Sequence, residues 1–247
     1  MKIIAIDSSG LTASVAVIED DNLIAEYNVQ YKKTHSQTLL PMLDEIKGMI
    51  DLDLATVDAI AIAKGPGSFT GLRIGSATAK GLAGALDIPI VEISTLEGLA
   101  CNLYGTDALV VPMMDARRSQ VYTAVYEFIQ QDDKYILSSV MEDSAMAVED
   151  LLVKVNELGA SLKKKIIFLG DGVPVYEDKI RELTDAVYTF APAHMNRQRA
   201  AAFGYLAIDK VNSGDVVSAF DHAPEYLRLS QAERERNEGI KNKGSNY

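Results

Sequence analysis

The chain repeats one order of predicted elements, and this repeat restricts its fold more than any other feature. In the first half, apolar and alternating segments predict strands at Lys2–Asp7, Thr12–Ile18 and Leu23–Val29. A helix, a buried-type strand at Val57–Ala63, a glycine-rich turn and a second helix follow. The order is therefore β-β-β-α-β-α, with a glycine turn after the fourth strand.

The second half follows the same order. Strands are predicted at Ala108–Met114, Gln120–Ile129 and Lys134–Val140, then a helix at Val148–Leu158 and a strand at Lys165–Leu169 that also ends in a glycine turn. An order used twice predicts a duplicated α/β architecture, with two lobes that each hold a mixed sheet flanked by helices.

The length of 247 residues suits two such lobes. We expect a first lobe over residues 1–104 and a second over 105–230. A helix near residues 196–212 can pack back on the first lobe. The charged residues 231–247 are expected to form a flexible tail.

The first predicted helix, His35–Ile50, carries more apolar residues than one buried stripe needs. They fall on two sides, with Leu40, Leu43 and Ile50 on one and Leu39, Met42 and Met49 on the other. A surface helix normally shows a single apolar stripe. We therefore expect a partner, within the fold or in another chain, to cover the second stripe around Leu39 and Met42.

The run Gly65–Arg73 is glycine-rich and precedes a helix of small residues that ends near Leu86. It is not a P-loop, because no Gly-Lys-Ser/Thr follows at the required spacing. Its helix start can take an anion, or its glycines can serve a tight turn. Glycines inside the helix indicate that something packs close to the backbone.

The first strand ends in Asp7-Ser8-Ser9-Gly10. Such a strand end can direct a carboxylate and hydroxyls at a nucleotide phosphate and its Mg²⁺, or it can be a polar turn. The corresponding turn of the second half, Met114–Arg118, is bulky and lacks glycine, which argues against a kinase. The candidate phosphate contacts are Asp7, Ser8, Ser9, Gly65 and Gly67.

Metal chemistry and hydrolysis receive little support. The histidines His35, His194 and His222 lie far apart, and Leu39 stands four residues after His35, where a second helical ligand would be needed. No G-x-S-x-G elbow is present. We predict no metal ligand and no catalytic residue, and we expect Cys101 to be inert core.

The net charge of −11 argues against a lone nucleic-acid binder, so any RNA should be held mostly by a more basic partner. No apolar run approaches the ~20 residues of a membrane span, and an early aspartate argues against a signal peptide. With its single cysteine, the protein is expected to be cytoplasmic.

The sequence resembles the TsaB (YeaZ) family along nearly its whole length, and the GPGSFTGLRI run is the most specific match. The matching stretches are Ile3–Ser9, His35-Ser36, Leu39–Pro41, Gly65–Ile74, Ser94–Leu96, Met114–Tyr122 and Pro224–Arg228.

This resemblance implies a duplicated actin-like ATPase fold and a non-catalytic subunit for threonylcarbamoyladenosine formation in tRNA. It implies that the chain binds and stabilises a catalytic TsaD paralogue, which carries an HxxxH metal motif, together with a TsaE ATPase. It also implies a homodimer when alone. No cofactor is expected, apart from weak or interface-dependent ATP or ADP.

The resemblance places partner binding on the helices at about His35–Ile50 and Thr70–Leu86. The expected interface residues are His35, Leu39, Leu40, Met42, Leu43, Ile46, Met49, Phe69, Leu72, Arg73, Ser76 and Lys80. Arg117 and Arg118 form a compact basic pair, either a tRNA contact or a solvated turn. The alternatives are an ATP-dependent kinase of the same fold and a metalloprotease related to the paralogue.

Overall fold

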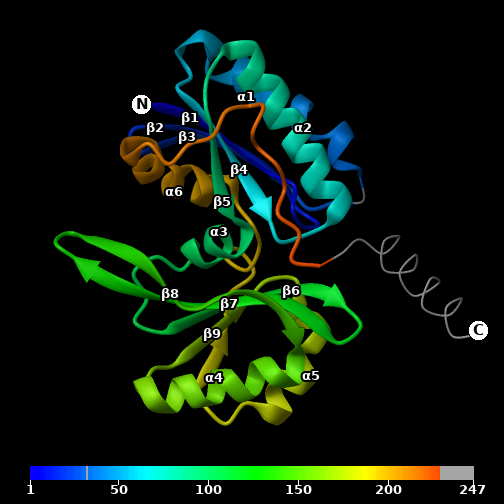
Figure 1. Ribbon diagram of the computed structural model, residues 1–247, viewed down its shortest axis with the longest axis vertical. Helices are drawn as coiled ribbons and strands as arrows, with labels where there is room; N and C mark the ends of the chain where they lie inside the picture. The colour runs from blue at the N-terminus through cyan, green and yellow to red at the C-terminus, as the bar shows by residue number, and fades with distance from the viewer. Residues whose placement is uncertain (32, 229–247) are drawn as a thin grey trace, which may run out of the picture.

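The computed structural model describes residues 1–31 and 33–228, which form two lobes around two five-stranded sheets (Figure 1). The first sheet has the order β3-β2-β1-β4-β5. Its strands are β1 (Lys2–Asp7), β2 (Ala13–Glu19), β3 (Asn22–Val29), β4 (Ala59–Gly65) and β5 (Ile90–Ser94). Strands β1, β4 and β5 are parallel, while β2 and β3 run antiparallel to their neighbours, so the sheet is mixed.

The second sheet has the order β10-β9-β6-β7-β8. Its strands are β6 (Leu109–Arg117), β7 (Gln120–Gln131), β8 (Lys134–Ala147), β9 (Ile166–Leu169) and β10 (Tyr188–Phe190). With strands counted along the chain in each half, both sheets read 3-2-1-4-5. The duplication predicted from the element order is therefore confirmed, and the mixed two-sheet architecture is that of the actin-like ATPase fold.

Six α-helices connect these strands within the described residues. They are α1 (Leu39–Met49), α2 (Phe69–Leu86), α3 (Thr95–Cys101), α4 (Val148–Leu162), α5 (Gly172–Leu183) and α6 (Ala200–Ser213). Each half therefore reads β-β-β-α-β-α-β-α, which adds a strand and a helix to the predicted order. None of the helices in the described ranges is long and apolar enough to cross a membrane.

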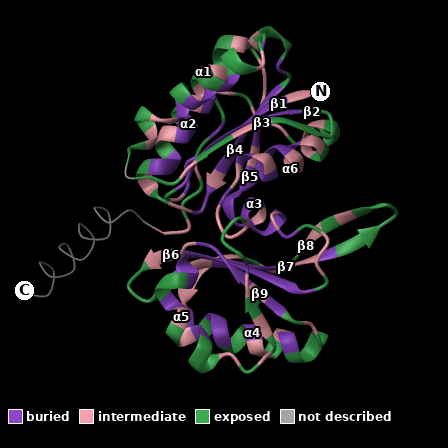
Figure 2. Ribbon diagram, turned by 180° about the vertical axis from the view of Figure 1, so that it is seen from behind, coloured by how far each residue is buried: buried purple, intermediate pink, exposed green. Residues whose placement is uncertain are grey.

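Strands β1, β2, β4 and β5 of the first sheet are buried on both faces, because alternate side chains point to opposite sides and helices cover each side. Ile4 and Ile6 of β1 pack under α1 and α2, whereas Ile3 and Ala5 of the same strand pack under α6. Figure 2 shows the central strands of both sheets as buried layers between the helices. Strands covered on both faces read as continuous apolar runs, as Lys2–Asp7 does.

The second sheet is also covered by helices on both faces, but one of these helices comes from the first half of the chain. Helices α4 and α5 cover one face of the second sheet, and α3, which follows β5 of the first lobe, packs on the other face. Helix α6, which follows β10 of the second lobe, packs on the first sheet. The last helix of each half therefore covers the sheet of the other half, and this exchange joins the lobes.

The start of α6 is held by the first sheet rather than by a local cap. The backbone N–H of Ala200 donates to Ser14 Oγ at 2.7 Å, and that of Ala201 donates to Glu26 Oε1 at 3.0 Å. Arg199 pairs with the other oxygen of Glu26. These contacts satisfy donors that a helix start leaves free. They explain why the helix begins at Ala200, later than the predicted residue 196.

The sequence analysis did not identify α5 or β10. Helix α5 is short and polar, and β10 has only three residues, so neither shows a long periodic pattern. The predicted tail at 231–247 lies outside the described residues. From α6, residues 215–228 return along β5 and α2 toward the gap between the lobes (Figure 1); we call this segment the strap.

Candidate functional site

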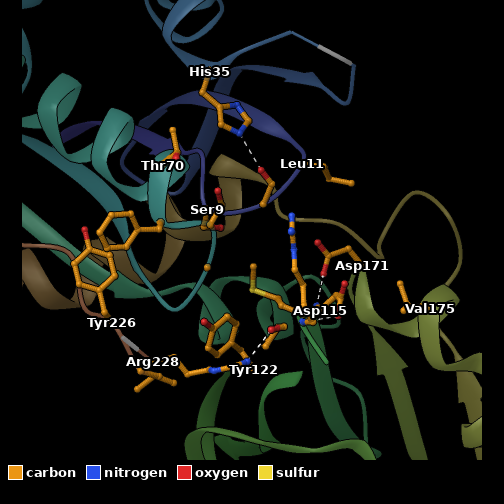
Figure 3. A pocket seen from close by; sticks show the side chains of 18 of the residues that line it. Ser9, Leu11, His35, Thr70, Asp115, Tyr122, Asp171, Val175, Tyr226 and Arg228 are labelled. Atoms are coloured by element: carbon orange, nitrogen blue, oxygen red, sulfur yellow. Dashed lines mark hydrogen bonds between the residues drawn. The ribbon is translucent and has the colours of Figure 1, made fainter. Parts of the chain in front are cut away.

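A cleft of about 680 Å³ opens between the lobes (Figure 3). One wall comes from the β1–β2 turn and the start of α2, another from the β6–β7 turn, and a third from the end of the strap. Only a few of its residues were predicted to bind a ligand. Those not identified include Tyr31 and Asp171 in turns, Tyr122 in β7, and Tyr226 and Arg228 in the strap.

The β1–β2 turn is pressed against the start of α2. The Ser8 hydroxyl donates to the Gly71 carbonyl at 2.8 Å, and the Ser68 N–H donates to the Ser9 carbonyl at 2.7 Å. A Cβ on Gly71 would collide with the Ser8 carbonyl oxygen, and one on Gly67 with that of Ser9. Glycine is therefore required where these two segments meet.

Because of this packing, only some of the residues predicted to contact phosphate line the cleft. Asp7 and Ser8 are buried by protein atoms and do not line the cleft, and the Glu225 carbonyl covers Gly65. Ser9 and Gly67 are the two predicted contacts that line the cleft. A phosphate in the cleft would meet the edge of the turn rather than the Asp7 carboxylate.

Several buried polar atoms around this turn lack a hydrogen-bond partner within the described part of the chain. They are Asp7 Oδ2, Ser9 Oγ, Thr12 Oγ1, His35 Nδ1 and Gln198 Nε2. Burial raises the pKa of Asp7 to about 6, although the Ser9 N–H donates to its other oxygen at 3.0 Å. Buried groups of this kind are places where water or a small polar ligand binds.

The second-lobe wall centres on Asp115 at the end of β6. Its carboxylate accepts hydrogen bonds from the Tyr176 hydroxyl and from the backbone N–H of Arg117, both at 2.8 Å. Its own N–H donates to Asp171 at 3.0 Å, and burial raises the pKa of Asp171. Both carboxylates are thus engaged in holding the β6–β7 turn.

That turn presents the predicted basic pair. Arg117, Arg118 and Ser119 all have positive φ angles, between 56° and 62°, which non-glycine residues rarely adopt. Both arginines are exposed, and neither forms an ion pair with another described residue. Arg117 lines the cleft, whereas Arg118 does not. The strap also reaches this turn, because Arg228 donates to the Ala116 carbonyl at 2.7 Å.

The predicted second apolar stripe of α1 is wrong. Leu39, Met42, Leu43 and Ile46 are all buried and form one inward stripe in the first lobe's own core. Leu72 and Ser76 of α2 are buried as well, so the first lobe itself covers these six residues. Their spacing at i, i+3, i+4 and i+7 is that of an ordinary amphipathic helix.

The remaining predicted interface residues are partly or fully exposed. Leu40 and Met49 are 53% and 74% exposed but lie on opposite flanks of α1. Phe69, Arg73 and Tyr226 stack together, with the Phe69 and Tyr226 ring centroids 4.7 Å apart. Lys80 is occupied by the strap, since its ammonium donates to the Phe220 and His222 carbonyls at 3.2 and 2.8 Å. His35 contacts the Gly10 carbonyl at 2.9 Å.

The outer face of α2, a helix predicted to bind the partner, carries an exposed surface whose residues were not among the predicted interface residues. Ala77, Gly81, Gly84 and Ala85 are exposed, and no atom lies within 4 Å of a Cβ built on Gly81. Their spacing places them on one side of the helix. We call these four residues the small-residue face. The prediction that glycines permit close packing holds inside the lobe for Gly71 and Gly75, while Gly81 remains uncovered.

Metal-binding side chains and the cysteine thiol are two further kinds of functional group that such a site could use. Within the described residues, no three histidine, cysteine, aspartate or glutamate side chains converge in a way that could hold a metal ion. Cys101 is buried, and this burial raises the pKa of its thiol to about 12. A thiol that remains protonated is a poor nucleophile.

Comparison with known proteins decides the family. The chain is 34% identical to the tRNA threonylcarbamoyladenosine biosynthesis protein TsaB of Bacillus subtilis over 233 residues, which cover 94% of this chain and 96% of that protein. The chain belongs to the TsaB family. Escherichia coli TsaB is 36% identical over 129 residues, which cover 51% of this chain and 55% of that one.

Solved structures agree with this membership. YeaZ from Pseudomonas aeruginosa superposes with a TM-score of 0.75 at 27% identity, covering 92% of this chain and 99% of that one. Residues 23–236 also match the family model described as TsaD: tRNA N6-adenosine threonylcarbamoyltransferase. TsaB proteins thus share a domain type with that transferase family, as the sequence resemblance indicated.

Proposed function

We propose that this chain acts in the cytoplasm in threonylcarbamoyladenosine formation on tRNA, as a non-catalytic subunit that binds and stabilises a TsaD-type paralogue. The support is membership of the TsaB family together with the small-residue face of α2, which is exposed although Ala219 of the strap lies 4.0 Å from a Cβ built on Gly84. A TsaE-type ATPase would join the complex, and without the paralogue the same face would pair with a second copy.

The chemistry of the surface supports a helix as the occupant. Small residues let two helix backbones approach closely and bring many atoms into contact. Leu40 and Met49, which are exposed on the two flanks of α1, and the stacked Phe69 can extend the contact. Figure 2 shows α1 and α2 side by side with exposed outer surfaces.

A non-catalytic role is supported by the position of His35. The residue four positions further on is Leu39, which lies in the core, and the His35 Nε2 atom contacts the Gly10 carbonyl. His35 lies in a 3-10 turn before α1, and the HxxxH spacing of a metal pair has no counterpart at His35 and Leu39. Arg117 and Arg118 would contact tRNA only within the assembled complex, because the chain alone carries a net charge of −11.

The experiment introduces a bulky residue on the small-residue face. Ala77→Arg and Gly81→Arg should leave the monomer folded but weaken binding to the purified paralogue by about tenfold or more, because the helices could no longer approach. Ala160→Arg, at an exposed position of α4, is the matched control. Leu39 and Met42 are unsuitable for this test, since substitutions there would damage the core.

The readout is affinity by calorimetry, with circular dichroism to check the fold. If all three variants bind the paralogue as the original chain does, the small-residue face is not the interface. If no variant and not even the original chain binds, the proposed partnership itself is wrong.

An ATP-dependent kinase is the alternative, and the cleft is the observation that favours it. Two features argue against a kinase: Asp7 is buried and does not reach the cleft, and the β6–β7 turn lacks the glycine expected of a phosphate-binding turn. Calorimetry with Mg-ATP on the isolated chain separates the two functions. Micromolar binding with turnover of a small acceptor would favour the kinase.

A further inference from the structure

A second groove, of about 560 Å³, lies away from the cleft between the lobes. It is bounded by α3 and the turn that follows, by α6, and by the projecting β7–β8 hairpin (Figure 1). Nothing in the proposed function uses it. Its lining combines a connected group of aromatic rings with more carboxylates than ammonium groups.

The aromatic group is centred on Tyr104. Its ring lies edge-on to those of Phe128, Tyr135 and Tyr205, with centroids 5.7, 5.6 and 5.5 Å away. The Tyr135 N–H donates to the Tyr104 hydroxyl at 2.8 Å, which fixes the hairpin against the turn after α3. Tyr104 nevertheless remains 44% exposed toward the groove. These rings form an ordered, partly open apolar wall.

The charged groups are unbalanced. Four carboxylates line the groove, those of Glu97 and Asp209 on the helical side and those of Asp132 and Asp133 on the hairpin side. None of the four pairs with a lysine or arginine of the described chain. Two lysines also line the groove: Lys210 is bound to Asp215 at 2.6 Å, and Lys134 lies on the hairpin side, so the carboxylates still outnumber the ammonium groups.

Glu97 is the most buried of these four carboxylates, and no ammonium or guanidinium group of the described chain forms an ion pair with it. Its carboxylate accepts a hydrogen bond from the Ser94 N–H at 3.3 Å, yet burial raises its pKa above the usual range. A cation in the groove would stabilise the ionised form. A metal ion does not fit, because the four carboxylates come from separate elements and do not converge within the described residues.

We propose that this groove binds a linear aliphatic polyamine. The methylene chain would lie along the rings of Tyr104, Tyr135 and Tyr205, and the ammonium groups would pair with carboxylates on the helical and hairpin sides. Ammonium groups also interact favourably with aromatic ring faces. A purely apolar ligand would leave the carboxylates unpaired, and a compact cation would leave the aromatic wall unused.

The test is calorimetric titration of the full chain with spermidine at physiological salt. The original chain should bind saturably, with a Kd below about 1 mM. The double variant Glu97→Gln, Asp209→Asn should bind about tenfold more weakly, because charge-assisted contacts are lost. Glutamine at 97 can keep the helix-capping hydrogen bond, and Asp209→Asn alone, at an exposed position, provides a second variant that should fold.

The matched control removes the same charge elsewhere, with Glu157→Gln on α4 and Asp178→Asn on α5, both exposed. It should bind as the original chain does. An equal loss in test and control variants would show diffuse attraction to an acidic surface and overturn the site, as would the absence of saturable binding. Trilysine carries similar ammonium groups on a peptide; tighter binding of trilysine than of spermidine would assign the groove to a protein segment instead.

Discussion

The hydroxyl of Ser94 donates a hydrogen bond to the carboxylate of Asp143 and so joins the first sheet to the second. Ser94 ends β5 and also caps α3, where its oxygen accepts from the Leu96 N–H at 3.1 Å. Asp143 lies in β8, and its other oxygen accepts from the Tyr126 hydroxyl at 2.6 Å. One serine therefore serves both the helix that crosses between the lobes and the contact between them.

Replacing this serine should be costly. Ser94→Ala removes a helix cap and a hydrogen bond to a partly buried carboxylate, so we expect a loss of about 2–4 kcal/mol in the free energy of unfolding. Urea denaturation measures it. Ser213→Ala, which removes an exposed hydroxyl at the end of α6, should cost less than about 0.5 kcal/mol. Equal losses would mean that the contact between the lobes contributes little.

Two glycines of α2 should respond in opposite ways to alanine. Gly71→Ala places a methyl against the Ser8 carbonyl, so it should destabilise the chain by about 2 kcal/mol or more and disturb the cleft. Gly81→Ala meets no atom within 4 Å and should stabilise the helix by about 0.5–1 kcal/mol. Thermal unfolding of the two variants gives the comparison, and changes of the same sign would contradict the packing described for α2.

Asp7 should destabilise the native state at neutral pH. Its folded pKa of about 6 lies above the ordinary value of 3.8, so the folded chain favours the neutral acid, and stability falls as the pH rises between these values. Asp7→Asn should therefore gain up to about 3 kcal/mol at pH 7.5 and almost nothing near pH 4. Urea denaturation at both pH values tests this. A gain that is the same at both would exclude ionisation as the cause.

Lys80 should hold the strap in place. Lys80→Met removes the ammonium that binds the Phe220 and His222 carbonyls, while its alkyl chain is kept. We expect faster cleavage within residues 215–228 in limited proteolysis, by about fivefold or more if the lost contacts contribute about 1 kcal/mol. Lys154→Met, at an exposed position of α4, should leave the cleavage rate unchanged. Unchanged cleavage in Lys80→Met would show that the His222–Glu92 contact and the Val217–Ile90 pairing are sufficient.

The order of elements could be predicted from the sequence because long strands and helices have periodic patterns of apolar residues. Strand β1 is apolar from Ile3 to Ile6 because helices cover both faces of its sheet, and the repeat of the element order predicted the duplication. Helix α5 and strand β10 were missed because their segments are short and mostly polar.

The interface prediction failed in part because a count of apolar residues does not say which of them the lobe itself covers. Leu39 and Met42 were assigned to a second stripe, but they are buried in the core where α1 packs on β2 and β3. The sequence feature that could have indicated an exposed helix face is the spacing of Ala77, Gly81, Gly84 and Ala85. It identifies one side of α2, yet only the structure shows that this side is the uncovered one.

The sequence by itself determined the duplicated architecture, the family resemblance and the absence of a second histidine four residues after His35, because these depend on residue type and spacing along the chain. The tertiary structure alone decided which groups reach a surface. Asp7 and Ser8 are buried because the start of α2, which includes Gly71, packs against the β1–β2 turn. Helices α3 and α6 each cover the sheet of the other half. Such contacts depend on chain segments that meet only after folding, so no local pattern records them.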